Sequence, residues 1–251
     1  MSNPIVFVHG FRYDPRTFGP DHPEYHTYPR WREMLPDREV MPFEWFSNPS
    51  LWDAWRAERW NHYRLAWDLA KQASERLVTT VTATHGPVDI VCHSLGSRVT
   101  MLALERCSNV SRVLILNGAE YGSTGAAIAL ACPEIRFYNV VVPADDVLGT
   151  LARFAPGRGR KFLGSHGIPS AALKEISTSS WIAPPNWQDL HLGNSLLLTT
   201  WAIDHDLEVP EGDNPRRMAD HWYTFENEDN WPLYRAILSG EWDEWRLSEP
   251  S

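Results

Sequence analysis

Residues 88–98 read Val-Asp-Ile-Val-Cys-His-Ser-Leu-Gly-Ser-Arg and decide the fold of this chain. The first five, 88–92, are mostly apolar and follow a Gly-Pro pair, which is typical of a buried strand. After the stretch, apolar residues recur at helical spacing. Ser94 therefore lies on a sharp turn from a strand to a helix. A serine on such a turn has a strained backbone and needs small residues two positions away on either side, and here these are Cys92 and Gly96.

Two roles are open for Ser94 at this point. The first amides of the helix that follows point back at the serine, which suits a nucleophile whose reaction produces an oxyanion. A serine directly before a helix can also be an ordinary N-cap. The rest of the chain has to decide between a catalytic and a purely structural serine.

Composition and charge limit the class of protein. The chain has 251 residues, of which 43% are hydrophobic and 22% charged, so it can bury a sizeable core. The net charge of −9 argues against a nucleic-acid or anionic-membrane partner. No apolar segment reaches the ~18 residues of a membrane span. Nothing in the sequence indicates an oligomeric state.

The three cysteines, Cys92, Cys107 and Cys132, predict a cytoplasmic protein. Their number is odd and no zinc-binding spacing joins them, so we interpret them as reduced thiols. The N-terminus also lacks the pattern of a signal peptide, because residues 4–8 already read as a strand.

Strand and helix signals alternate along the chain. Besides 88–92, strands are expected at 5–8, 39–45, 112–116 and 135–142. Helices are expected over 50–83, directly after Ser94, over 122–132 and from residue 231. This alternation predicts a single α/β domain over residues 1–251, with a mostly parallel sheet flanked by helices.

Two segments do not fit the alternation. Residues 12–37 are rich in proline and histidine and predict a long ordered loop, and residues 153–215 have little regular pattern beyond a loop at 181–187 and a short apolar element at 196–203. We expect both segments, 12–37 and 153–215, to be insertions that cover a pocket. His22 and His26 are four residues apart, but Pro23 argues against a shared helical face, so no metal site is predicted.

Several polar residues follow the expected strands directly. His9-Gly10-Phe11 ends one strand, Ser94 follows another, and Asp145 lies after the strand at 135–142. Because ligands of parallel α/β sheets bind beyond the carboxyl ends of the strands, these residues mark a candidate site. A serine needs an imidazole as base and a carboxylate to orient that imidazole. The chain order Ser94, Asp145, His221 is the order found with a nucleophile elbow.

These motifs resemble the α/β-hydrolase superfamily of lipases and esterases. Ile-Val-Phe-Val-His-Gly-Phe at 5–11 resembles the strand that ends in His-Gly, and Val-Cys-His-Ser-Leu-Gly at 91–96 resembles the nucleophile elbow. The resemblance implies an oxyanion hole made by the amides of Phe11 and Leu95, and chemistry without a metal or organic cofactor. The chain departs from the family in three ways. The first two strands are missing, and Cys92 replaces the first glycine of the elbow. The distance of 76 residues from Asp145 to His221 is long for the family, which implies an insertion near the site, as does the segment at 12–37.

The resemblance also guides the choice of acid and base. Asp145 fits the Asp-x-Val pattern of related lipases, with Asp146 as the alternative acid. His221 precedes an aromatic run and a terminal helix, as in the family, whereas three other histidines compete with it: His166, His191 and His205.

The sequence thus predicts a serine hydrolase that cleaves small carboxylic esters or related acyl compounds through an acyl-enzyme on Ser94. Two alternatives stay open. One is a hydrolase-fold protein that binds a ligand without turnover, for which Cys92 is the only support. The other is an acyltransferase that uses the same three residues.

Overall fold

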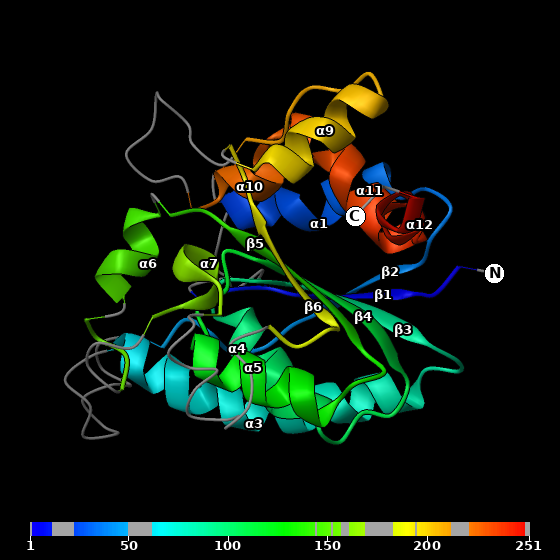
Figure 1. Ribbon diagram of the computed structural model, residues 1–251. Helices are drawn as coiled ribbons and strands as arrows, with labels where there is room; N and C mark the ends of the chain where they lie inside the picture. The colour runs from blue at the N-terminus through cyan, green and yellow to red at the C-terminus, as the bar shows by residue number, and fades with distance from the viewer. Residues whose placement is uncertain are drawn as a thin grey trace.

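A six-stranded, all-parallel sheet forms the centre of the protein (Figure 1). The structure is a computed structural model, and it describes residues 2–11, 23–49, 62–143, 145–151, 153–156, 161–168, 183–193, 195–211 and 221–248. The strand order is β2-β1-β3-β4-β5-β6. The strands are β1 (Ile5–Val8), β2 (Val40–Phe43), β3 (Val88–His93), β4 (Val110–Leu116), β5 (Arg136–Val141) and β6 (Trp187–His191).

Alternate residues of the strands fill two separate hydrophobic cores. In β1, Val6 and Val8 belong to one core, whereas Ile5 and Phe7 belong to the other. The inner strands follow the same rule, because successive side chains of a strand point to opposite faces of the sheet. Both faces are therefore buried, which explains why the inner strands read as continuous apolar runs.

Helices cover each face of the sheet. The first core contains residues of α3 (His62–Ala83), α4 (Gly96–Leu104), α5 (Gly122–Ala131), α6 (Asp146–Leu151) and α7 (Leu163–His166). The second contains residues of α1 (Pro23–Met34), α9 (Leu196–Asp204), α11 (Trp231–Ser239) and α12 (Glu241–Ser248). Figure 1 shows α3, α4 and α5 below the sheet and α1, α9 and α11 above it. The short helices α10 (Tyr223–Glu226) and η1 (Glu228–Asn230) precede α11.

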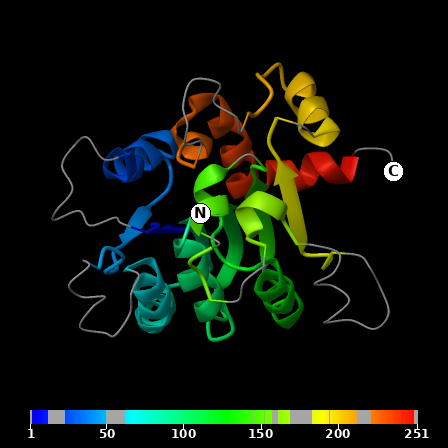
Figure 2. The same ribbon diagram turned by 90° about the vertical axis from the view of Figure 1, so that its left-hand side faces the viewer.

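All six strands end at the same edge of the sheet. In the parallel register, Val8 lies opposite Cys92, and His93 lies opposite Leu116. The carboxyl ends of β1, β3, β4 and β5 are thus side by side at the left of Figure 1, and this edge faces the viewer in Figure 2. The segments that follow these strands carry the candidate site residues.

The predicted α/β class is confirmed, and so are the five strands that were expected. One local prediction is wrong, and two elements were not predicted. Residues 23–34 of the expected loop form helix α1, which begins at Pro23, and Trp31 and Met34 of this helix pack in the second core. The expected loop that ended at residue 187 leads into a sixth strand, and a further helix, α12, follows α11.

Other predictions fall outside the described residues. These are the first part of the expected helix at 50–83, up to residue 61, and parts of both expected cover segments, at 12–22, 157–160, 169–182, 194 and 212–215, so the cover remains a prediction. The three cysteines are free thiols and all are buried. None of the helices in the described part of the chain has the length and apolar character that a bilayer crossing requires.

Candidate active site at the carboxyl edge of the sheet

Ser94 lies on a turn that connects β3 directly to α4. Its φ of 51° places it in the left-handed region, which is unusual for a serine. The strain is held in place by hydrogen bonds: the Ser94 amide donates to Leu116 O at 3.0 Å, and its carbonyl accepts from the amides of Ser97 at 3.0 Å and Ala119 at 2.9 Å. A left-handed serine between a parallel strand and a helix is the structural context of a nucleophile elbow.

The two small residues beside Ser94 have different reasons to be small. A Cβ atom at Gly96 would lie 2.3 Å from the carbonyl oxygen of Val8, so only glycine lets α4 begin this close to the end of β1. Cys92 lies within β3, paired with Val8 and Ile115 in regular register, where a side chain is accommodated in the core. The elbow geometry is therefore present with cysteine at this position. Burial raises the pKa of the Cys92 thiol to about 12, so the thiol is neutral at physiological pH.

Asp145 and His221 lie in contact although they are far apart in the sequence. The Nδ1 atom of His221 is 2.7 Å from Oδ2 of Asp145, and both residues are buried, at 2% and 3% exposure. Asp145 follows β5 and precedes α6, where its Oδ1 accepts from the Leu148 amide at 3.0 Å. Because a carboxylate only accepts hydrogen bonds, the proton on the His221 ring is at Nδ1, and Nε2 is left to act as a base.

The surroundings of Asp145 keep it ionised. Burial by itself would raise the pKa of this carboxyl group. The charge and hydrogen bond of His221, the amide of Leu148 and the side chain of Asn117 outweigh burial, so the pKa lies below its usual value. An ionised carboxylate at this position can orient the imidazole and stabilise the imidazolium that forms when His221 takes a proton.

The alternative residues lie elsewhere. Asp146 is exposed as the first residue of α6, and His191 and His205 are also exposed. His166 has its own neighbour Ser165 as hydrogen-bond partner, with Oγ and Nδ1 2.8 Å apart. In the described ranges, no group of three or more His, Cys, Asp or Glu side chains is arranged to hold a metal ion.

His93 connects the strand that carries the serine with the segment that carries His221. Its Nε2 lies 3.1 Å from the carbonyl oxygen of His221, and the two imidazole rings are 4.7 Å apart between centroids. Since Ser94 follows His93 directly, this contact brings the expected base to the elbow. The hydrogen bonds among the described residues do not include one between the Ser94 hydroxyl and the His221 ring. Hydrogen bonds of this type commonly shorten when substrate binds.

The two residues expected to form an oxyanion hole, Phe11 and Leu95, follow β1 and precede α4, where the end of β1 lies beside the first turn of α4. Leu95 is the N-cap residue of α4, and amides at this end of a helix have no partner within the helix. On the other side, the ring of Phe11 packs on His62 and Tyr63, with centroids 5.7 and 5.1 Å apart. The segment before Phe11 is fixed by His9.

His9 has a structural part in this segment. Its Nε2 accepts a hydrogen bond from the Trp45 amide at 3.2 Å, so its proton is on Nδ1, which lies 3.0 Å from the Gly10 carbonyl oxygen. The Trp45 indole donates to the carbonyl of His9 at 2.9 Å. Through these hydrogen bonds His9 supports the turn that follows β1.

Two polar residues of the site were not singled out in the sequence. Asn117 follows β4, is fully buried, and donates from Nδ2 to Asp145 Oδ2 at 2.8 Å. Thr224 in α10 donates from its hydroxyl to Asn117 Oδ1. The sequence offered one signal for Asn117: it directly follows the strand next to β3. A residue in this position lies at the same edge of the sheet as Ser94.

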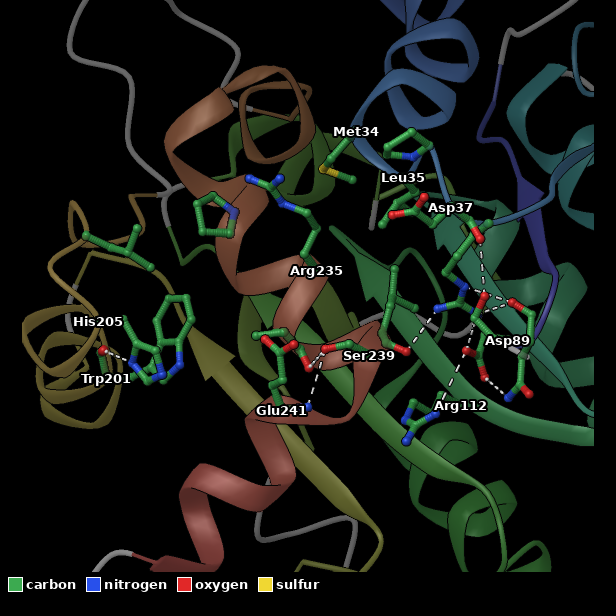
Figure 3. Close-up of a pocket in the computed structure, with 18 residues that line it drawn as sticks. Met34, Leu35, Asp37, Asp89, Arg112, Trp201, His205, Arg235, Ser239 and Glu241 are labelled. Carbon is green, nitrogen blue, oxygen red and sulfur yellow. Dashed lines mark hydrogen bonds and ion pairs between the residues drawn. The ribbon is translucent and has the colours of Figure 1, made fainter.

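The cavity in Figure 3 lies at the opposite edge of the sheet. Its volume is about 750 Å³, and its walls include Arg38, Asp89, Arg112 and residues of α9 and α11. Asp89 is fully buried and accepts from Arg38 Nη2 at 2.6 Å, with Arg112 Nη1 at 3.9 Å. Asp89 precedes Ser94 by five strand residues, which is about 16 Å. Asp89 and the two arginines pair with one another near the amino ends of the strands. The cavity is therefore separate from the candidate active site, which lies at the carboxyl ends.

The all-parallel sheet with helices on both faces, the left-handed Ser94 after β3 and the contact of Asp145 with His221 agree with what the resemblance led us to expect. In comparisons with known proteins, no family model and no curated protein matches the chain. The solved structures to which the chain is similar include the following two, both at low identity. One is the product of the gene lin2722 of Listeria innocua, with 10% identity, a TM-score of 0.47 and coverage of 95% of this chain and 94% of that one. The other is a candidate YdeN-like hydrolase of Pectobacterium atrosepticum, with 14% identity, a TM-score of 0.32 and coverage of 70% and 91%.

Proposed function

We propose that this protein is a serine hydrolase that cleaves carboxylic esters or related small acyl compounds. Ser94 is the nucleophile, His221 the general base and acid, and Asp145 the residue that orients His221. The amides of Phe11 and Leu95 are the donors for the oxyanion. No metal or organic cofactor takes part in this reaction.

The reaction has two halves. Ser94 Oγ attacks the carbonyl carbon of the substrate while its proton moves to Nε2 of His221. The oxyanion that forms is stabilised by the two amides, each worth about 3 kcal/mol in such reactions. When this intermediate collapses, the bond to the leaving alcohol breaks and His221 returns the proton to it. A water molecule, deprotonated by His221, then attacks the carbonyl carbon of the acyl-enzyme. The bond between this carbon and Ser94 Oγ breaks, His221 returns the proton to Oγ, and the acid is released.

One observation carries the proposal: the hydrogen bond between His221 Nδ1 and Asp145 at 2.7 Å, in a buried site next to the elbow. The two residues are 76 positions apart in the chain. A histidine with an ionised, hydrogen-bonded carboxylate on one ring nitrogen is oriented to act as a base on the other. The left-handed geometry of Ser94 supports a nucleophile rather than a simple helix cap.

A fluorophosphonate probe tests the proposal, because it labels only an activated serine. We expect labelling of the wild-type protein at Ser94, located by mass spectrometry, and release of p-nitrophenol from short acyl esters. Ser94→Ala should abolish both without changing the thermal midpoint appreciably. Ser97→Ala is not a suitable control, because its hydroxyl supports the elbow at 2.7 Å from Ser94 O. Ser165→Ala is suitable, since Ser165 pairs with His166 and has no part in the proposed reaction.

The same measurements separate this proposal from the alternatives. A wild-type protein that is neither labelled nor active on an ester series of rising chain length would contradict the hydrolase and favour ligand binding without turnover. Labelling at Ser94 together with faster product formation when an alcohol or amine is added would favour acyl transfer.

A further inference from the structure

Asn117 lies between the expected acid and the segment that carries the expected base. It directly follows β4 with a φ of 47°, a left-handed geometry that asparagine tolerates better than most residues. Its Nδ2 donates to Asp145 Oδ2 at 2.8 Å, and its Oδ1 accepts from the Thr224 hydroxyl. Asn117 and Thr224 are both fully buried, so these hydrogen bonds are shielded from water.

The chemistry of the partners fixes the direction of each hydrogen bond. Asp145 as a carboxylate can only accept, so the amide nitrogen of Asn117 must face it. The amide oxygen of Asn117 then faces Thr224, whose hydroxyl must donate. No other orientation of the amide satisfies both neighbours, and this makes Asn117 a rigid connection rather than a residue that can rotate.

Thr224 is itself held by the C-terminal helices. Its carbonyl oxygen accepts from the Tyr234 hydroxyl at 2.5 Å and from Asn230 Nδ2 at 3.2 Å. Thr224 is only three residues after His221, in the helix that follows it. Through Asn117, the end of β4 is therefore joined both to the acid and to the segment that carries the base.

Asp145 Oδ2 accepts two hydrogen bonds at once. His221 Nδ1 and Asn117 Nδ2 both lie within 2.8 Å of it, while Oδ1 is occupied by the Leu148 amide. If the carboxylate rotated, it would lose its bonds to Asn117 and Leu148. The network thus keeps one defined oxygen facing the imidazole.

We propose that Asn117 is a positioning residue for the Asp145–His221 pair and that Thr224 orients Asn117 for this task. This inference rests on the proposed function, because it assigns a role within the same site. The structure contains a matched comparison: Asn139 in β5 is also fully buried and donates from Nδ2 to a carboxylate, Asp189 Oδ1, at 2.7 Å. That pair is outside the candidate site.

Replacing Asn117 should impair the reaction more than the fold. We expect Asn117→Ala to lower the rate of fluorophosphonate labelling and kcat for ester hydrolysis by about 10- to 100-fold, the effect of a lost hydrogen bond to a charged group. Asn139→Ala should lower the thermal midpoint to a similar extent but leave the labelling rate near that of the wild type.

The two partners of Asn117 give further tests. Thr224→Val removes the hydroxyl at nearly constant volume and should lower kcat, whereas Thr224→Ser keeps a donor and should restore most of it. Asn117→Asp places a second carboxyl group beside Asp145, and two such groups disfavour joint ionisation. The acidic limb of its pH–rate profile should therefore move to higher pH, which a merely structural role of Asn117 would not cause.

A measurement that needs no turnover completes the test. The Nδ1 proton between His221 and Asp145 should give a downfield proton NMR signal in the wild type and in Asn139→Ala, and the signal should be weakened or lost in Asn117→Ala. If Asn117→Ala keeps this signal and is labelled as fast as Asn139→Ala, the inference is overturned. If the wild type shows the signal but is not labelled, the proposed function fails, while loss of the signal in Asn117→Ala still supports the positioning role.

Discussion

The imidazole of His93 donates from Nε2 to the backbone carbonyl of His221 at 3.1 Å, so the residue directly before the expected nucleophile holds the expected base. The two residues are 128 positions apart. His93 is buried at the end of β3 and is not the expected proton acceptor, so we interpret its contact with His221 as structural.

This contact predicts a graded effect of substitutions at His93. His93→Ala removes the donor to the His221 carbonyl and should lower kcat/KM for short esters by about tenfold, the effect of one hydrogen bond of ordinary strength. His93→Gln has an amide that can donate to the same oxygen and should lose less. Equal losses in both variants would show that the volume of the ring matters and the hydrogen bond does not.

The choice between the two adjacent carboxylates can be tested directly. Asp145→Asn would keep the shape but remove the charge that orients His221, and we expect kcat to fall on the order of 10⁴-fold. Asp146→Asn changes an exposed side chain one residue away and should leave kcat within twofold of the wild type, about 0.4 kcal/mol. Steady-state kinetics on the same ester decides, and a large loss in Asp146→Asn alone would reverse the assignment.

The lowered pKa of Asp145 predicts a dependence of stability on pH. Between the folded pKa and the ordinary value of about 3.9, the unfolded state binds more protons than the folded state. This carboxylate therefore stabilises the fold fully above pH 4 to 5, and its contribution is lost as the pH falls through the folded pKa.

Urea unfolding of the wild type and Asp145→Asn between pH 2 and 7 measures this contribution. The difference in the free energy of unfolding between the two proteins should be constant above pH 5 or so and shrink in acid. A difference that grows as the pH falls would contradict the direction of the pKa shift.

The close approach of α4 to β1 predicts a difference between two glycines. Gly96→Ala places a Cβ atom 2.3 Å from a backbone oxygen, so the strand end or the helix must move, and we expect a loss of about 3 kcal/mol of stability. Gly149→Ala, in α6, meets nothing within 4 Å, and should be neutral or stabilising by about 0.5 kcal/mol. Chemical denaturation of both variants gives the comparison, and similar stabilities would exclude a tight elbow.

The strands and the elbow could be predicted because their signals are local. An inner strand of a parallel sheet is buried on both faces, so its residues are apolar in succession, as in β3 and β4. The other elements carried weaker signals. β6 is an edge strand with half-buried polar residues, Gln188 and Asp189, which hide its pattern. Helix α1 begins at Pro23 and contains Pro29, and prolines of this kind usually indicate a loop.

The sequence by itself determined the class of fold and the expected nucleophile, because a buried strand, a strained turn and a helix follow one another within residues 88–104. It also limited the candidates for the acid and the base to a small set, namely Asp145 and Asp146, and His166, His191, His205 and His221. Only the tertiary structure decided which members of that set meet, since the contacts of Asp145 with His221 and of Asn117 with Thr224 join segments 76 and 107 positions apart. The path of the chain between such segments is set by the packing of whole helices on the sheet, and no local pattern of residues specifies it.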